Sequence, residues 1–143
     1  MGEIPSGDAL MVGILLDTHA IIWFFLNSSQ ISKKAVLPIE ERVQTGAPIF
    51  LAAISLVEII YLIEKGRIPQ IALDRLEAQI ISPDSPLKVI PLDIPVAQSL
   101  RKIPRKTVSD MPDRIIAATA LHHSLPLVTS DSKIRLTGIE TIW

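Results

Sequence analysis

The sequence of 143 residues contains no cysteine, which excludes disulfide bonds, cysteine nucleophiles, thiolate zinc sites and iron–sulfur clusters. Only three histidines are present, so a structural zinc site is not expected. The 14 basic and 15 acidic side chains leave a formal net charge of -1, which excludes a nucleic-acid binder that works through bulk positive charge. Neither G-x-G-x-x-G nor G-x-x-x-x-G-K-[ST] occurs, which excludes nucleotide-binding enzymes built on these loops. Phosphate binding would therefore need a local basic patch or a metal.

One apolar stretch, residues 9–26, is long enough to be considered as a membrane span. Asp17 and His19 lie in its middle, and an aspartate at the centre of a bilayer costs about 2.5 kcal/mol or more. We therefore predict no transmembrane helix. No basic residue precedes Met11, which argues against a signal peptide. These features favour a cytoplasmic protein.

The domain organisation is predicted to be simple. Pro5 and Gly7 interrupt the first residues, and a periodic apolar pattern begins only near Met11, so residues 1–11 are expected to form a disordered leader. No linker or internal repeat divides the remainder, and the length suits one hydrophobic core. We expect a single domain over residues 12–143.

Short apolar runs alternate with helical patterns along this domain. Strands are predicted over residues 12–17, 48–53, 87–92, 125–131 and 138–143. Helices are predicted over residues 18–26, 32–45, 54–66, 69–81, 94–102 and 110–124. This alternation is typical of an α/β fold, with a central parallel sheet of four to five short strands flanked by helices. Ligands of such sheets bind beyond the carboxyl ends of the strands.

Four acidic residues occur near these strand ends and helix starts: Asp17, Glu58, Asp113 and Asp131. Each has a purely structural explanation. The first and the last are suited to capping the helices that follow them. The second lies three residues after Ser55 and the third three residues after Asp110, which is the spacing of a capping box.

The four acids taken together favour a different interpretation. In a parallel sheet they would converge at one edge, and Glu58 would stand among apolar neighbours where an unpartnered carboxylate is costly. Converging carboxylates repel one another unless a cation neutralises them. Oxygen ligands without thiolates suit Mg²⁺ or Mn²⁺, and such ions commonly act on phosphate esters.

Four sequence blocks then resemble a known family: LLDTHAIIW, ISLVEIIYLIEKGRI, DRIIAATALHHSLPLVTSD and GIETIW. In this order and spacing they resemble the PIN-domain ribonucleases, specifically the VapC toxins of type II toxin-antitoxin pairs. The resemblance spans residues 13–143. It implies a PIN-like three-layer α/β fold, an Mg²⁺-dependent endoribonuclease acting on RNA, a homodimer, and a VapB-type antitoxin as partner.

The resemblance also assigns roles to individual positions. The four acids match the four acids of the family in order, and they would be both catalytic residues and metal ligands. Thr18 and Thr129 would support the acids or position substrate, and Arg114 would contact phosphate or orient a carboxylate. The sequence departs from the family where Val108 replaces a common histidine and where the proline is shifted to Pro112. These departures concern substrate positioning near Asp110, and all four acids of the family pattern remain.

Two further features have competing interpretations. The segment RKIPRK either holds RNA phosphates beside the site or forms a solvated surface loop. Its basic residues are Arg101, Lys102, Arg105 and Lys106. His19 lies two residues after Asp17 and invites assignment as a general base, but metal-bound water supplies a nucleophile without one.

The main hypothesis is thus an Mg²⁺-dependent endoribonuclease, with Mn²⁺ as a substitute ion. One alternative is a PIN fold that binds partners without catalysis. Another is a receiver-type signalling module, which would need a phosphoryl-accepting aspartate after a central strand, and Asp93 is the available candidate.

Overall fold

The computed structural model describes residues 12–143, and the expected leader over residues 1–11 lies outside them. The strands are β1 (Ile14–Leu16), β2 (Ile49–Ala52), β3 (Leu87–Ile90), β4 (Leu127–Val128) and β5 (Thr141–Ile142). The helices are α1 (Thr18–Phe25), α2 (Lys33–Thr45), α3 (Ala53–Glu64), α4 (Gln70–Ile81), α5 (Ile94–Ser99), α6 (Met111–His123) and α7 (Ser132–Arg135). A 3₁₀ turn, η1 (Leu100–Lys102), follows α5, so the helix predicted over residues 94–102 divides in two.

The five strands form one parallel sheet in the order β3-β2-β1-β4-β5. The central strand, β1, is buried at all three residues, as its uninterrupted apolar sequence predicts for a strand covered on both faces. Ile14 and Leu16 join one core cluster, and Leu15 joins the other, because alternate side chains of a strand point to opposite faces. The predicted α/β fold with a central parallel sheet is confirmed.

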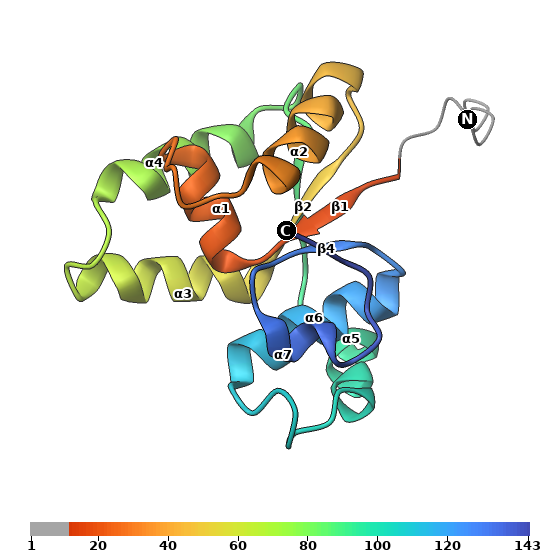
Figure 1. The fold of residues 1–143 in the computed structure, drawn as a ribbon. Helices are drawn as coiled ribbons and strands as arrows, with labels where there is room; N and C mark the ends of the chain where they lie inside the picture. The colour runs from red at the N-terminus through yellow and green to blue at the C-terminus, as the bar shows by residue number, and fades with distance from the viewer. Residues whose placement is uncertain (1–11) are drawn as a thin grey trace.

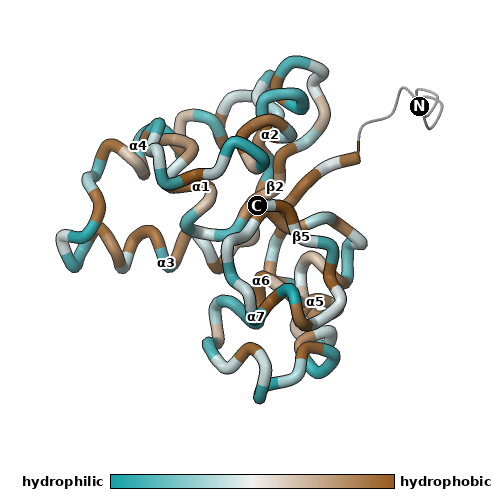
Figure 2. Tube along the Cα trace, viewed as in Figure 1, coloured by the Kyte–Doolittle hydropathy of each residue, from teal (hydrophilic) through white to brown (hydrophobic). Residues whose placement is uncertain are grey.

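Helices cover both faces of the sheet and complete three layers (Figure 1). One core lies against α1, α2, α3 and α4 and contains the buried side chains of Ile21, Ile39, Ile59 and Leu76. The other lies against α6 and α7 and contains those of Ile116 and Ile134. The hydropathy colouring follows this plan, with apolar segments through the centre and along α3 (Figure 2). None of the helices in the described chain is long and apolar enough to cross a membrane.

The helix ends test the capping predictions. Asp17 caps α1, and its side chain accepts a hydrogen bond from the Ala20 N–H at 2.8 Å. Asp131 likewise caps α7, accepting from the Lys133 N–H at 2.8 Å. The predicted capping box at Ser55 is wrong, because α3 begins two residues earlier at Ala53 and its N-cap makes no side-chain hydrogen bond.

Asp93 also has a structural role, which bears on the receiver hypothesis. Its side chain caps α5 by accepting a hydrogen bond from the Val96 N–H at 3.1 Å. The strand before it, β3, is at the edge of the sheet and not at its centre. The arrangement that a phosphoryl-accepting receiver aspartate would need is therefore missing at this residue.

Candidate active site

The carboxyl ends of the central strands carry the acids that the sequence singles out. Asp17 follows β1, and Thr129 follows the neighbouring strand β4. Leu16 pairs with Val128 in the parallel register, so the next two residues lie side by side at the same edge. The other acids come from the first two turns of α3 and α6 and from the N-cap of α7.

Thr129 connects the two acids that follow strands. Its side chain is fully buried, donates a hydrogen bond to the Asp17 carboxylate, and accepts one from the Asp131 N–H at 3.1 Å. Burial raises the pKa of Asp17 above its ordinary value, while the hydrogen bonds from Thr129 and from the Ala20 N–H oppose this effect. Thr129 thus contacts both of the acids that follow strands.

Glu58 is likewise held by a hydrogen bond from a threonine, Thr18. The hydroxyl of Thr18 donates to Glu58 Oε1 at 2.5 Å and is hydrogen-bonded to the hydroxyl of Ser55 at 2.9 Å. All three side chains meet where α1 packs against α3, and Ser55 is fully buried. Burial raises the pKa of Glu58, and the hydrogen bond from Thr18 acts in the opposite direction. Ser55 therefore serves the acid cluster and not the helix end.

Asp113 shows the strongest coupling to its surroundings. Its pKa is raised from 3.8 to about 7, first by burial and then by four neighbouring carboxylates. In decreasing order of effect these are Asp110, Asp131, Glu58 and Asp17. All four predicted acids thus act on one another electrostatically. Asp110, which the sequence suggested only as a cap, belongs to the same group and also accepts a hydrogen bond from the Asp113 N–H at 3.1 Å.

A polar cavity of about 140 Å³ opens beside these acids. It is lined by Val108, Ser109, Asp110, Asp113, Asp131 and Lys133. Lys133 is a residue that sequence reasoning missed, although its position two residues after Asp131 at a strand end was a usable signal. Val108 stands where the family often has a histidine, and it is buried and forms an apolar wall of this cavity.

The donor set suits a hard divalent cation. Carboxylate oxygens are among the ligands that Mg²⁺ and Mn²⁺ prefer, and partly buried carboxylates with raised pKa values gain from a neighbouring positive charge. Within residues 12–143, no group of three His, Asp or Glu side chains is arranged to coordinate a metal ion. Asp17, Glu58 and Asp131 each use an oxygen to accept a hydrogen bond, from the Ala20 N–H, the Thr18 hydroxyl and the Lys133 N–H respectively.

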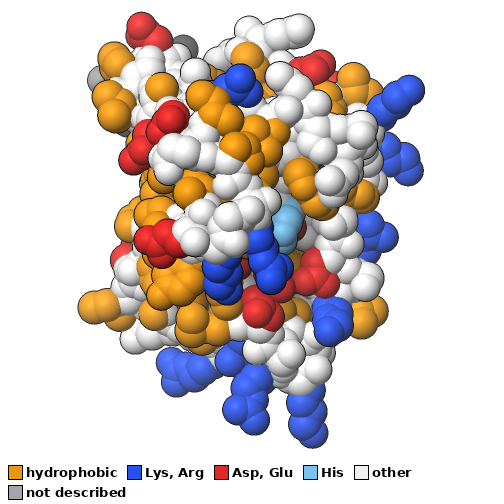
Figure 3. Space-filling model, turned by 90° about the vertical axis from the view of Figure 1, so that its left-hand side faces the viewer, with side chains coloured by type: hydrophobic (Ala, Val, Ile, Leu, Met, Phe, Trp, Pro, Cys, Tyr) orange, Lys and Arg blue, Asp and Glu red, His pale blue; other side chains and the backbone are white. Residues whose placement is uncertain are grey.

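The remaining predicted residues lie around the cluster. Arg114 contacts none of the acids by hydrogen bond, because its Nε donates to the Ile103 carbonyl at 2.8 Å and holds the turn after η1 against α6. The basic residues of RKIPRK are exposed on η1 and the following loop. Figure 3 shows acidic side chains near the centre of one face, with basic side chains beside them and along its lower end.

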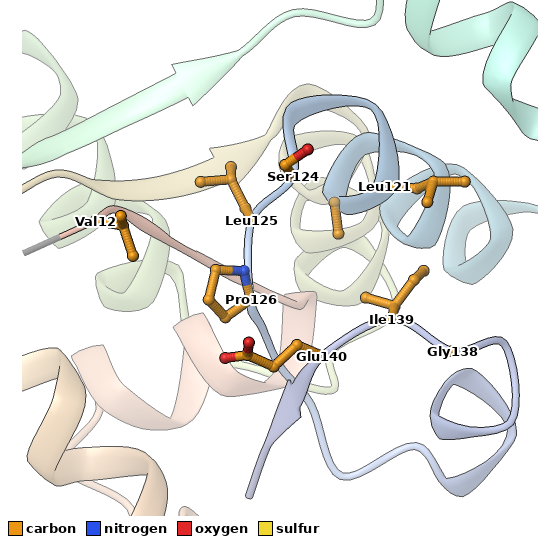
Figure 4. A pocket seen from close by; sticks show the side chains of 9 residues that line it. Val12, Leu121, Ser124, Leu125, Pro126, Gly138, Ile139 and Glu140 are labelled. Atoms are coloured by element: carbon orange, nitrogen blue, oxygen red, sulfur yellow. The ribbon is translucent and has the colours of Figure 1, made fainter.

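A second cavity is far less suited to this chemistry. It has a volume of about 370 Å³ and lies at the amino ends of the strands, opposite the acids (Figure 4). Val12, Pro126 and Glu140 line it just before β1, β4 and β5 begin. The lining is mainly apolar and contains one carboxylate, so it offers no set of metal ligands.

The fold and the site define a class of protein: a small three-layer α/β domain with a cluster of acids at the carboxyl edge of a parallel sheet. The model of the PIN domain family matches residues 14–140. The chain belongs to the PIN-domain family, and the family predicted from the sequence blocks is confirmed.

Known proteins agree with this assignment. Ribonuclease VapC22 of Mycobacterium tuberculosis is 30% identical over 125 residues, which are 87% of this chain and 92% of that protein. The solved structure of DNA-bound VapBC from Salmonella typhimurium matches with a TM-score of 0.68 and 23% identity, covering 92% of this chain and 97% of that one. FitAcB from Neisseria gonorrhoeae matches with a TM-score of 0.61 and 27% identity, covering 90% and 95%.

Proposed function

We propose that this protein is a metal-dependent endoribonuclease that hydrolyses RNA phosphodiester bonds. The observation that carries the proposal is the meeting of five carboxylates at one sheet edge, where burial first and then the four neighbouring carboxylates raise the pKa of Asp113 to about 7. Such a cluster is unfavourable for stability by itself, because buried like charges repel. The cluster is explained if it binds a cation, which in turn binds a phosphate group. The similarity to a ribonuclease of the same family supports RNA as the substrate.

The catalytic residues and metal ligands in this proposal are Asp17, Glu58, Asp113 and Asp131. Mg²⁺, or Mn²⁺ in its place, would supply a water of lowered pKa and neutralise charge on the phosphate oxygens. Thr129 and Thr18 orient the carboxylates through their hydrogen bonds. Asp113 must lose its proton before it can act as a ligand, so binding is favoured above pH 7.

His19 is not needed as a general base. Its side chain is exposed, and its ring packs against Trp23 with the ring centres 5.5 Å apart. Burial raises the pKa values of Asp17 and Glu58, and His19 is among the groups that oppose this rise, so it lies close enough to influence both acids. We assign it to the rim of the site.

The basic side chains around the cluster would hold the RNA backbone. Lys133 lines the acid cavity itself, and the exposed residues of RKIPRK flank the loop that enters α6. Arg101, Lys102, Arg105 and Lys106 would each add salt-dependent affinity without selecting sequence. Arg114 contributes indirectly, by holding that loop through the Ile103 carbonyl.

The cellular role proposed is that of the toxin in a VapBC-type pair in the cytoplasm. Solved relatives of the fold are complexes named VapBC and FitAcB, which supports a VapB-type antitoxin as partner. A homodimer, which the sequence resemblance implies, is part of the same proposal.

The test is cleavage of a mixed RNA pool by purified protein with Mg²⁺, compared with EDTA-treated protein and with Asp113→Asn. Cleavage by the untreated wild type alone is expected. Asp113→Asn should keep the fold, because Asn preserves the shape of the side chain, and circular dichroism serves as the control. Full activity of this variant would contradict the assignment. Folded wild-type protein that neither cleaves RNA nor binds Mg²⁺ would favour the alternative, a PIN fold that binds partners without catalysis.

A further inference from the structure

The acid cluster lies between two hollows of different chemistry. One is the polar cavity that contains Asp113, Asp131 and Lys133. The other is a groove of about 370 Å³ between α1, α3 and the start of α6. Glu58 lines this groove and is also a member of the acid cluster, so the groove opens directly onto the site.

The groove is lined by exposed apolar and aromatic side chains. The exposed fraction is 59% for Tyr61, 47% for Val57 and 62% for Met111, which is high for large apolar side chains. The His19 ring forms part of the wall on the α1 side. Exposed apolar surface of this kind, grouped in one hollow, indicates a place where a ligand is covered.

A positive charge completes the groove. Lys65 lines it and follows the last residue of α3, while Glu58 lies about two turns further back toward the acids. A ligand that spans the groove therefore meets carboxylates at one end, a flat aromatic surface between, and a cation at the other. Figure 3 shows acidic, histidine and basic side chains close together near the centre of one face.

A polynucleotide has groups that match this order. In an RNA strand that is cut internally, nucleotides continue on both sides of the scissile phosphate. Each hollow beside the acids would therefore receive the nucleotides on one side. The polar cavity with Lys133 suits sugar and phosphate. Tyrosine and histidine rings are the usual platforms on which unpaired bases stack, and a lysine beyond them meets the next phosphate.

We propose that the groove between α1 and α3 binds the base of the nucleotide next to the scissile phosphate, stacked on Tyr61, with Lys65 on the phosphate that follows. This inference rests on the proposed function, since it takes RNA as the substrate. It makes Tyr61 a determinant of cleavage-site preference. The two flanks of the cut are then recognised differently: one through its base and the other through its backbone.

The binding test uses a fluorescein-labelled single-stranded RNA of mixed sequence and the Asp113→Asn background, so that cleavage does not interfere. Adding Tyr61→Ala should weaken binding roughly 5- to 150-fold, the range for one stacked base. Tyr61→Phe keeps the ring and should bind as the Asp113→Asn protein does. Lys65→Gln should weaken binding less and lower its salt dependence. Ile71→Ala, an exposed apolar position on α4, is the matched control and should have no effect.

A second measurement keeps this inference separate from the nuclease proposal. In the otherwise wild-type chain, the ends of cleaved RNA are sequenced, and Tyr61→Ala should lose base preference at one flanking position. Wild-type cleavage with preference and affinity unchanged in Tyr61→Ala would overturn the groove inference and leave the nuclease intact. Tyr61-dependent RNA affinity without any wild-type cleavage would support the groove and contradict the nuclease. A change from dimer to monomer in light scattering, at unchanged RNA affinity, would assign the groove to a contact between copies and overturn the inference.

Discussion

The metal-free protein should lose stability as the pH rises, and Asp113 should be responsible for a measurable part of the loss. The pKa of its carboxyl is about 7 in the folded chain and 3.8 as its ordinary value. Between these values the folded protein holds a proton that the unfolded chain has released. The free energy of unfolding therefore decreases as pH rises from about 4 to 7, and the contribution is fully lost above 7.

The size of this effect follows from the two pKa values. Their difference corresponds to about 4 kcal/mol at about 1.36 kcal/mol per pH unit. Asp113 is only partly buried, so water screens its charge, and we expect about 2 kcal/mol in practice. The change should appear in the difference between the wild type and Asp113→Asn, because Asn stays neutral at every pH and other titrating groups are common to both.

The assay is urea unfolding of EDTA-treated wild type and Asp113→Asn at pH 5 and pH 8. The window between pH 5 and pH 7 covers about two thirds of the interval over which Asp113 titrates, so the wild type should lose about 1 kcal/mol more between these pH values than the variant does. Added Mg²⁺ should stabilise the wild type more at pH 8 than at pH 5, because the ion competes with the proton. Equal pH dependence in the two proteins would refute the argument that Asp113 is protonated near neutrality.

Substitutions at three further positions test contacts that support the fold and the site. Gly13→Ala places a Cβ atom against the Phe50 ring and should lower the free energy of unfolding by about 1–3 kcal/mol, measured in urea. Thr18→Val removes the donor to Glu58 and should cost about 1–3 kcal/mol, whereas Thr18→Ser should retain most of the stability; equal losses would argue against the hydrogen bond. Arg42 is 8% exposed and donates to two backbone carbonyls, so Arg42→Ala should cost about 2 kcal/mol or more in thermal unfolding, and an unchanged Tm would disprove this role.

Much of the fold was predictable because the local sequence patterns are those that the strands and helices of a parallel α/β fold require. The all-apolar run at β1 and the helix stop at Gly46, which adopts a positive φ of 75°, are both visible in the residues. The same holds for the N-caps Asp17 and Asp131. The prediction of a capping box at Ser55 was wrong because it rested on local spacing, whereas the hydrogen bond that the Ser55 hydroxyl makes is with a residue far away in the sequence. Its hydroxyl is hydrogen-bonded to Thr18, 37 positions away.

The sequence by itself determined the family and the alternation of strands and helices, apart from the short helix α7, since these depend on periodicity and on motif spacing. It also placed Asp17, Glu58, Asp113 and Asp131 near the carboxyl edge of the sheet, whereas the membership of Asp110 in this group emerged only from the fold. Only the tertiary structure decided how the acids are partnered. The Thr18–Glu58 hydrogen bond and the place of Lys133 in the acid cavity both depend on helix packing. So does the position of the acids between two unlike hollows. The physical reason is that burial, and with it the raised pKa of Asp113, arises from side chains far apart in the chain that share one space.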